Sequence, residues 1–264
     1  NGLDLSGTGA GGAGALTGTG TAAYTGGVTL LADARVGTTT ASDQLTLSGA
    51  ITGANRLEKS GAGTVILDNA NNDYSGGTTI SAGTLRTNVA SALPDDRAVS
   101  VGTSGTLDLL SHDQSIGTLT GDGTVTLGNA TLTVRDGDFA GQIGGGTGRL
   151  SKTSSGTLIL SNANTYTGGT TIQQGTLTAR HAQALNQGQV TVADGATLHI
   201  DNVTLALANG LDLSGTGAGG VGALTGTGTA AYTGGVTLIA DARVGTTTAS
   251  DQLTLSGAIT GANR

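Results

Sequence analysis

The best candidate for a chemical site is the segment Arg135-Asp136-Gly137-Asp138. On a strand, Asp136 and Asp138 would project to the same side, because successive side chains alternate between the two faces. Such a pair of carboxylates could serve acid/base catalysis or bind a hard cation such as Ca²⁺. The motif occurs once, and no neighbouring segment supplies further acids. We therefore expect no catalytic residues and no metal site, and leave open a weak cation site at Asp136 and Asp138.

The other residue types that carry chemistry are isolated. His112, His181 and His199 are far apart and lack metal-ligand spacing, so we expect solvated or turn histidines. The absence of Cys removes disulfides, zinc thiolates and thiol nucleophiles. A G-x-G-x-x-G pattern at residues 7–12 returns at 215–220, but no helical period follows, as dinucleotide binding would require. We expect no cofactor, and ligand-binding residues stay unknown.

Four tyrosines share one context, since each precedes Thr or Ser and then Gly-Gly. We predict that each ring fills a wide corner of the fold; the alternative is an exposed aromatic platform for sugar. Asn69 and Asn162 occupy equivalent positions in two similar segments, and we expect them to stack or to bind backbone at a corner. The tyrosines are Tyr24, Tyr74, Tyr166 and Tyr232.

Composition limits both the core and the partners. The chain has 264 residues with 49 Gly, 2% aromatic residues and 11% charged residues, so its core must be narrow. The net charge of −7 makes nucleic acid and anionic membrane surfaces poor partners. The first residues lack both Met and a signal-peptide pattern, so we expect a segment excised from a longer protein.

A long internal repeat sets the organisation of the chain. Residues 1–56 return as residues 209–264, and only Ala13→Val221 and Leu31→Ile239 differ. We predict that residues 1–208 are one tandem unit, that 209–264 start the next, and that 1–264 form a single continuous β-helix.

Shorter repeats predict the fold. Gly-Thr-Leu signals recur about every 20 residues, with short alternating strands such as Thr64–Leu67 and no helical stripe. This period is typical of an all-β, parallel β-solenoid with about 20 residues per coil. Inward positions would hold Leu, Ile, Val and Ala, glycines would serve the corners, and threonines would face water.

Residues 150–177 carry a family resemblance. Their pattern, L-x-K-x3-G-T-L-x-L-x2-A-N-x-Y-x-G-G-T-T-I-x2-G-T-L, resembles the autotransporter-associated β-strand repeat of type V secreted passenger domains. Residues 57–109 show it less cleanly, because one residue is inserted and Val65 replaces Leu. The resemblance implies a right-handed parallel β-helix at the surface of a Gram-negative bacterium. It also implies export through a C-terminal outer-membrane β-barrel outside this sequence, which would be the only link to a membrane.

The resemblance implies a non-enzymatic adhesin or stalk. Expected partners are identical passengers, which would give cell–cell aggregation, or a host or abiotic surface. Two alternatives remain. A polysaccharide-degrading β-helix would need acids on consecutive coils, and an ice-binding repeat would need flat threonine ladders, suggested by Thr124–Thr126 and by Thr131-Leu132-Thr133.

Overall fold

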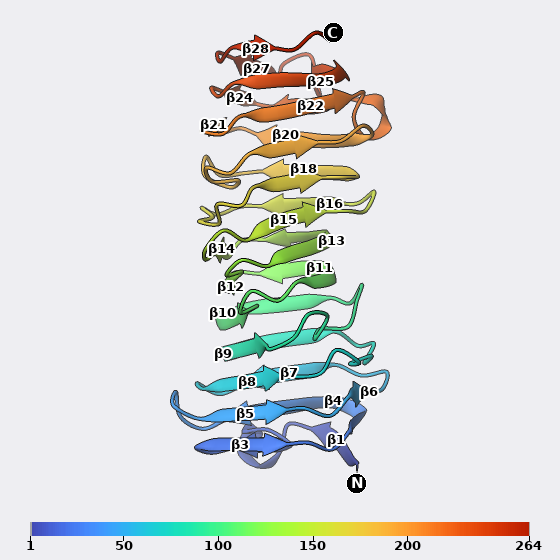
Figure 1. The fold of residues 1–264 in the computed structure, drawn as a ribbon, viewed down its shortest axis with the longest axis vertical. Coiled ribbons are helices and arrows are strands. Elements are labelled where there is room, and N and C mark those ends of the chain that lie inside the picture. Colours follow the sequence, from blue (N-terminus) through green and yellow to red (C-terminus); the bar gives the residue numbers. More distant parts are fainter. Residues whose placement is uncertain (1, 264) are drawn as a thin grey trace. The chain divides into compact units, whose positions relative to one another are not determined.

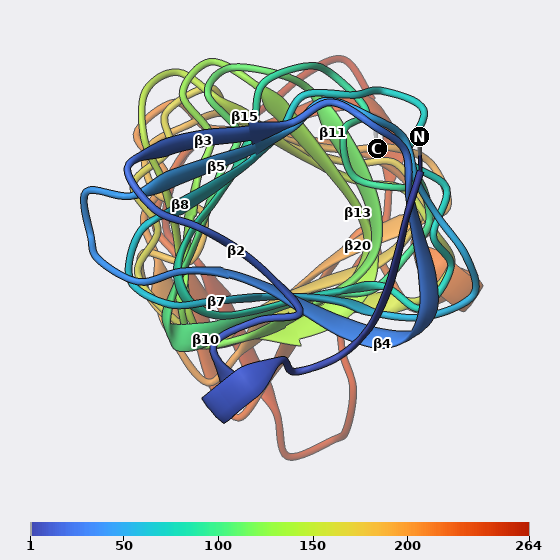
Figure 2. The same cartoon turned by 90° about the horizontal axis from the view of Figure 1, so that it is seen from below.

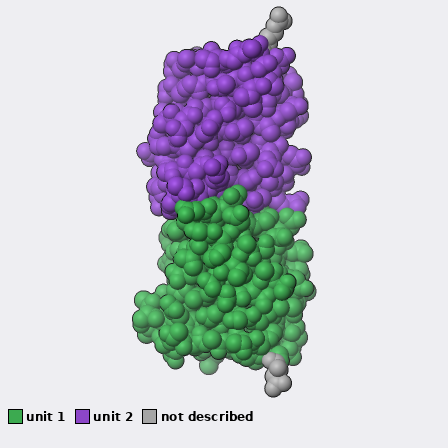
Figure 3. All heavy atoms as spheres, viewed as in Figure 1, with its two compact units in different colours: residues 1–132 green, residues 133–264 purple. Residues whose placement is uncertain are grey.

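The computed structural model describes residues 2–263 and is all-β, with parallel strands stacked turn on turn. Each turn takes about 21 residues, so the predicted β-solenoid is confirmed. The chain divides into two compact units, residues 1–132 and 133–264 (Figure 3), which we describe separately. Within residues 2–263, no helix has the length and apolar character needed to cross a bilayer.

Strands of the first unit begin where β-branched and apolar residues alternate with polar ones. The short stretch Thr64–Leu67 is a strand as predicted, and Thr124–Thr126 is also a strand. The elements, shown in Figure 1, are β1 (Leu3–Gly7), the 3-10 turn η1 (Ala10–Gly12), β2 (Leu16–Gly18), β3 (Thr21–Tyr24), β4 (Val28–Thr38), β5 (Gln44–Leu47), β6 (Ile51–Thr52), β7 (Leu57–Ser60), β8 (Thr64–Leu67), β9 (Thr78–Thr87), β10 (Val99–Asp108), β11 (Gln114–Gly121) and β12 (Thr124–Thr126).

Parallel pairing in this unit places equivalent residues of successive turns in columns. Strands β3, β5 and β8 pair in this way and lie along one side of the coil in Figure 2. One column points inward and is buried, whereas the column beside it points outward and is mainly threonine. The inward column is Leu45, Val65, Leu85, Leu107 and Val125; the outward column is Gln44, Thr64, Thr84, Thr106 and Thr124.

The second unit has the same kind of coil. Strand β13 (Thr131–Phe139) begins in the last residues of the first unit and continues into the second. The further elements are β14 (Gln142–Gly144), β15 (Arg149–Lys152), β16 (Thr157–Leu160), β17 (Thr170–Ile172), β18 (Gly175–Ala179), β19 (Val190–Val192), β20 (Ala196–Asp201), β21 (Thr204–Leu205), β22 (Leu211–Gly215), the 3-10 turn η2 (Ala218–Gly220), β23 (Leu224–Thr227), β24 (Thr229–Tyr232), β25 (Val236–Ala242), β26 (Val244–Thr246), β27 (Gln252–Leu255) and β28 (Ile259–Thr260).

Buried columns also run through the second unit, and one of them starts with a lysine. Buried aliphatic side chains occupy most positions on successive turns, so the core is mainly a thin stack of Leu, Ile and Val, as expected. The two columns on the face formed by β15, β17, β19 and β22 are Leu150, Thr170, Val190 and Leu211, and Lys152, Ile172, Val192 and Leu213.

The long sequence repeat is also a structural repeat. Leu3 pairs with Val28 in the first unit, and Leu211 pairs with Val236 in the second, each followed by the same register shift. The 3-10 turns η1 and η2 both centre on a left-handed glycine, at φ 60° and 63°. Since nearly identical segments fold alike in both units, the 208-residue spacing repeats whole turns. Its role as a tandem unit stays a prediction.

Gly83 and Gly175 hold equivalent tight corners, at φ 64° and 67°. A Cβ atom at Gly175 would overlap the carbonyl oxygens of Gly156 and Ser154 on the preceding turn. The motif Gly-Thr-Leu therefore starts with Gly for two reasons, the left-handed backbone and the closeness of the next turn.

We predict that Gly175→Ala lowers the free energy of unfolding by at least about 3 kcal/mol, because it combines a positive φ with a backbone overlap. Gly195→Ala is the control, since Gly195 has φ 78° but open space where a Cβ would lie. It should cost only about 1–2 kcal/mol. Urea unfolding followed by circular dichroism measures both, and equal losses would contradict the overlap.

Candidate functional site

The predicted carboxylates lie on β13. Asp136 is half-buried and Asp138 is exposed. Gly137, which separates them, pairs with Leu158 and has φ 142°, so the strand departs from a regular pleat between the two acids. Within residues 2–263, no three His, Asp or Glu side chains gather to hold a metal ion. A cation site at Asp136 and Asp138 stays an untested prediction.

The histidines occupy different environments. His181 accepts a hydrogen bond from the Gln183 backbone N–H at its Nδ1 (3.1 Å), as a turn histidine does. His199 lies in β20, so the expectation of a solvated or turn position was wrong for this residue. Its ring nitrogens contact the hydroxyls of Thr225 (2.9 Å) and Thr227 (2.6 Å), and burial lowers its pKa. His199 thus joins neighbouring turns.

Three of the four tyrosines are buried, and Tyr74 and Tyr166 lie between strands, which confirms the corner prediction for these two, whereas Tyr232 ends β24. Tyr74 and Tyr166 have no exposed surface. The Tyr74 hydroxyl lies 2.7 Å from Thr78 Oγ1, and the Tyr166 hydroxyl lies 2.7 Å from Thr170 Oγ1. Tyr232 is equally buried and donates to a backbone carbonyl. Tyr24 is half-buried. Buried rings cannot stack on sugar, so these three provide no aromatic platform.

Corner asparagines bind the backbone of adjacent turns. Asn69 donates to the Ser48 carbonyl (2.8 Å) and Asn162 to the Ala140 carbonyl (3.1 Å), which confirms the predicted corner role. Asn164, whose role the sequence did not reveal, is buried between three turns. Its Oδ1 accepts from Ile143 N (2.7 Å), and its Nδ2 donates to Ala184 O (2.6 Å).

Asn72 repeats this arrangement in the first unit. It accepts from Ile51 N (2.8 Å) and donates to Ala92 O (2.7 Å). The signal that could have revealed both residues is their equivalent place before the corner tyrosines, Tyr74 and Tyr166. Each asparagine satisfies buried backbone groups of the turns before and after its own.

The least expected residues are Lys59 and Lys152, the only two lysines in the chain. Both are fully buried at equivalent positions of the two repeats. Lys59 lies in an inward column, where it pairs with Val36 on one side and Ile80 on the other. The alternation of side chains along the strands is the signal that could have revealed both inward side chains, although charged side chains are rarely buried.

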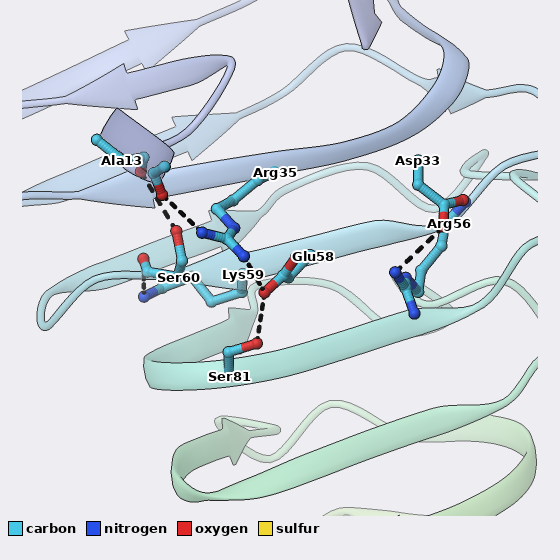
Figure 4. A network of polar contacts seen from close by, with 9 residues as sticks. Ala13, Asp33, Arg35, Arg56, Glu58, Lys59, Ser60 and Ser81 are labelled. Carbon is cyan, nitrogen blue, oxygen red and sulfur yellow. Dashed lines mark hydrogen bonds and ion pairs between the residues drawn. The ribbon is translucent and has the colours of Figure 1, made fainter. Parts of the chain in front are cut away.

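Each buried ammonium is surrounded by carbonyl oxygens of two successive corners. Lys59 Nζ donates to the carbonyls of Ser60 (2.8 Å), Gly61 (2.7 Å) and Ala82 (2.9 Å). In Figure 4, Lys59 lies next to Ser60, beside the outward ion pair of Arg35 with Glu58. The lysine therefore closes its own corner and ties it to the next turn.

Lys152 makes the equivalent contacts in the second unit. Its Nζ donates to the carbonyls of Ser154 (2.5 Å) and Gln174 (3.1 Å). Burial lowers the pKa of Lys59 to about 8, and burial likewise lowers that of Lys152 to about 8, although the charge of Asp136 opposes the change. An amine with such a pKa could act as a nucleophile. Here no substrate can reach it, so both lysines are structural.

The threonine column of the first unit bears on the ice-binding alternative. Thr64, Thr84, Thr106 and Thr124 are in register on consecutive turns. In the neighbouring outward column, however, Arg86 forms an ion pair with Asp108 (2.9 Å). Charged side chains interrupt the flat surface that this alternative requires.

Comparison with known proteins finds a family that matches two segments of the chain. Residues 57–86 and 150–179 match the passenger-associated-transport-repeat family, and each segment contains one buried lysine, one buried asparagine and one buried tyrosine. The two matched segments support an autotransporter passenger domain. The two matches begin at the residues where the sequence motif begins, so the predicted resemblance is confirmed.

Two relatives illustrate what the chain is similar to. It is 38% identical over 153 residues to the adhesin BmaC autotransporter of Brucella suis biovar 1 (strain 1330), covering 54% of this chain and 4% of that protein. It is 33% identical over 152 residues to the uncharacterized lipoprotein YdeK of Escherichia coli (strain K12), covering 56% of this chain and 11% of that protein. No solved structure matches the chain.

The buried lysines predict a pH-dependent stability. In the unfolded chain a lysine keeps its ordinary pKa of 10.5. Between about pH 8 and 10, each of the two lysines is therefore more fully protonated in the unfolded chain than in the folded chain. The free energy of unfolding should therefore rise with pH across this window. Above pH 10 the slope should reverse, because burial raises the pKa values of Tyr74 and Tyr166. Urea unfolding at pH 7.5 to 9.5 measures the rise.

The double variant Lys59→Met/Lys152→Met is the matched control. It should lose the rise with pH, and at pH 7.5 each substitution should cost about 1–3 kcal/mol because carbonyl oxygens lose their donors. Since the chain has only two lysines, ¹³Cε NMR of labelled lysine follows both directly. Titration of both signals near pH 10.5 would contradict the prediction.

Proposed function

We propose that this passenger segment is a non-enzymatic adhesive module at the surface of a Gram-negative bacterium, where it mediates attachment to a surface or association between cells. The observation that carries this proposal is the match of about half of the chain to a relative named as an adhesin, together with the two passenger-associated-transport repeats. Export to the surface is part of the proposal, because passenger domains are the exported parts of autotransporters.

The side chains that could do chemistry favour a non-enzymatic role. Both low-pKa lysines are enclosed by backbone carbonyls, and three of the tyrosines are buried. Asp136 and Asp138 are not joined by other acids on the described part of the chain. A polysaccharide-degrading enzyme would need a cluster of acidic side chains on its surface.

Repetition supports adhesion through many weak contacts. Leu31 on β4 and Ile239 on β25 occupy equivalent positions of the two 56-residue copies, and they are 63% and 51% exposed. The substitution between the copies keeps an aliphatic side chain there. We propose that the 208-residue period repeats this contact, so that weak association at each copy adds up.

We predict that beads carrying the chain aggregate, and that Leu31→Asp/Ile239→Asp slows aggregation at least fivefold by placing charge in an apolar contact. The matched control is Leu110→Asp/Gln183→Asp, which adds the same charge at exposed positions outside the long repeat. Light scattering of the bead suspension measures the rate.

Equal slowing by both double variants would show that general charge repulsion is responsible and would contradict a contact at Leu31 and Ile239. If wild-type beads neither aggregate nor attach to glass or to host-cell layers, the adhesive role itself is wrong.

A further inference from the structure

The second unit contains a polar cleft of about 470 Å³ on the face where β15, β17 and β19 begin. Arg149, Gln189 and Asn209 project from corners of different turns, and Thr171 and Thr191 form the adjoining floor. The corner between Arg149 and Gln189 contributes Gly168 and Gly169, which have no side chains. The cleft thus exists because one corner of the stack is bare.

The backbone keeps this corner bare. A Cβ atom at Gly168 would overlap the carbonyl of Thr147, and one at Gly169 would overlap that of Gln189. Backbone hydrogen bonds from Leu150 N to Gly169 O (3.1 Å) and from Thr170 N to Gln189 O (2.9 Å) fix the three corners against one another. The hollow is therefore part of the coil.

Charge in the cleft is uneven. Arg149 is exposed and has no ion-pair partner among residues 2–263, whereas Arg35, Arg56, Arg86 and Arg180 each pair with a carboxylate. At the other side, Gln189 Nε2 donates to Asp212 Oδ2 (2.6 Å), which orients the amide. A ligand would meet one free cation, and then amides and hydroxyls.

From this arrangement we infer that the cleft binds an acidic saccharide, with its carboxylate on Arg149 and its hydroxyls on Gln189, Asn209 and the threonines. A planar guanidinium matches a carboxylate in two hydrogen bonds. No aromatic residue lines the cleft, so stacking cannot hold a neutral sugar, and charge must supply the selectivity. This inference rests on the proposed adhesive function and names a ligand class for it.

The first unit contains the same corner, but without an unpaired arginine and without the glutamine amide. Thr78 N donates to Ala98 O there as Thr170 N does to Gln189 O, so alanine stands in the place of Gln189. Arg56, the equivalent of Arg149, pairs with Asp33 (3.1 Å). Both repeats therefore share the geometry of the coil, and only the second repeat has the side chains that form the cleft.

Calorimetric titration of the complete 264-residue chain with trigalacturonate tests the inference, and the methyl ester of the same trisaccharide removes only the charge. We expect Arg149→Gln to weaken binding by at least tenfold, as loss of a charge-assisted hydrogen bond does. Gln189→Ala, which copies the first repeat, should weaken it about threefold to tenfold. Arg97→Gln removes the same charge from an exposed turn and should leave binding unchanged.

Equal binding of the methyl ester, unchanged binding by Arg149→Gln, or absence of binding to wild type would each overturn the inference. Equal binding of triglutamate would assign the cleft to acidic peptides instead. Thermal unfolding of each variant shows that it is folded. Bead aggregation is measured without saccharide, so failure of the cleft and failure of the adhesive role are distinguishable.

Discussion

Hydrogen bonding between the backbones of successive turns is the interaction on which each unit depends. A parallel strand has no local partner for its N–H and C=O groups, so every turn must present its strand in register with the turns on either side. This condition sets the residue count of a turn and brings equivalent residues into columns. The narrow columns accept Leu, Ile and Val, which explains why so few aromatic residues are present.

Corners are the places where this pairing is interrupted, and the chain uses polar side chains there to replace it. Lys59 and Lys152 donate to carbonyls of two successive corners. Asn72 and Asn164 join three turns, and the hydroxyls of Tyr74 and Tyr166 contact threonine hydroxyls. The two matched repeats of this chain thus share a set of buried polar groups that satisfy the backbone where strands end.

The sequence predicts the strands and the coil well, because both depend on short-range alternation and on a period near 20 residues. Thr64–Leu67, the corner asparagines Asn69 and Asn162, and the packing of Tyr74 and Tyr166 follow from it. The burial of the two lysines does not follow from the sequence pattern, since charged side chains are usually exposed to water.

The polar cleft could not be predicted from the sequence for another reason. Arg149, Gln189 and Asn209 are 40 and 20 residues apart along the chain, and they become neighbours only once it is known which corners stack. Asp136 and Asp138, by contrast, attract attention because they are close in sequence. In a solenoid, proximity along the chain is a poor guide to a surface site, whereas spacing by whole turns is a good one.

Amide hydrogen exchange tests the central claim, that pairing between successive turns holds each unit together. The account predicts that Thr84 N–H and Thr176 N–H, which donate to Gly63 O and Gly156 O, exchange only as fast as the chain unfolds globally. Exchange of these two amides within seconds, at a rate independent of added urea, would contradict it.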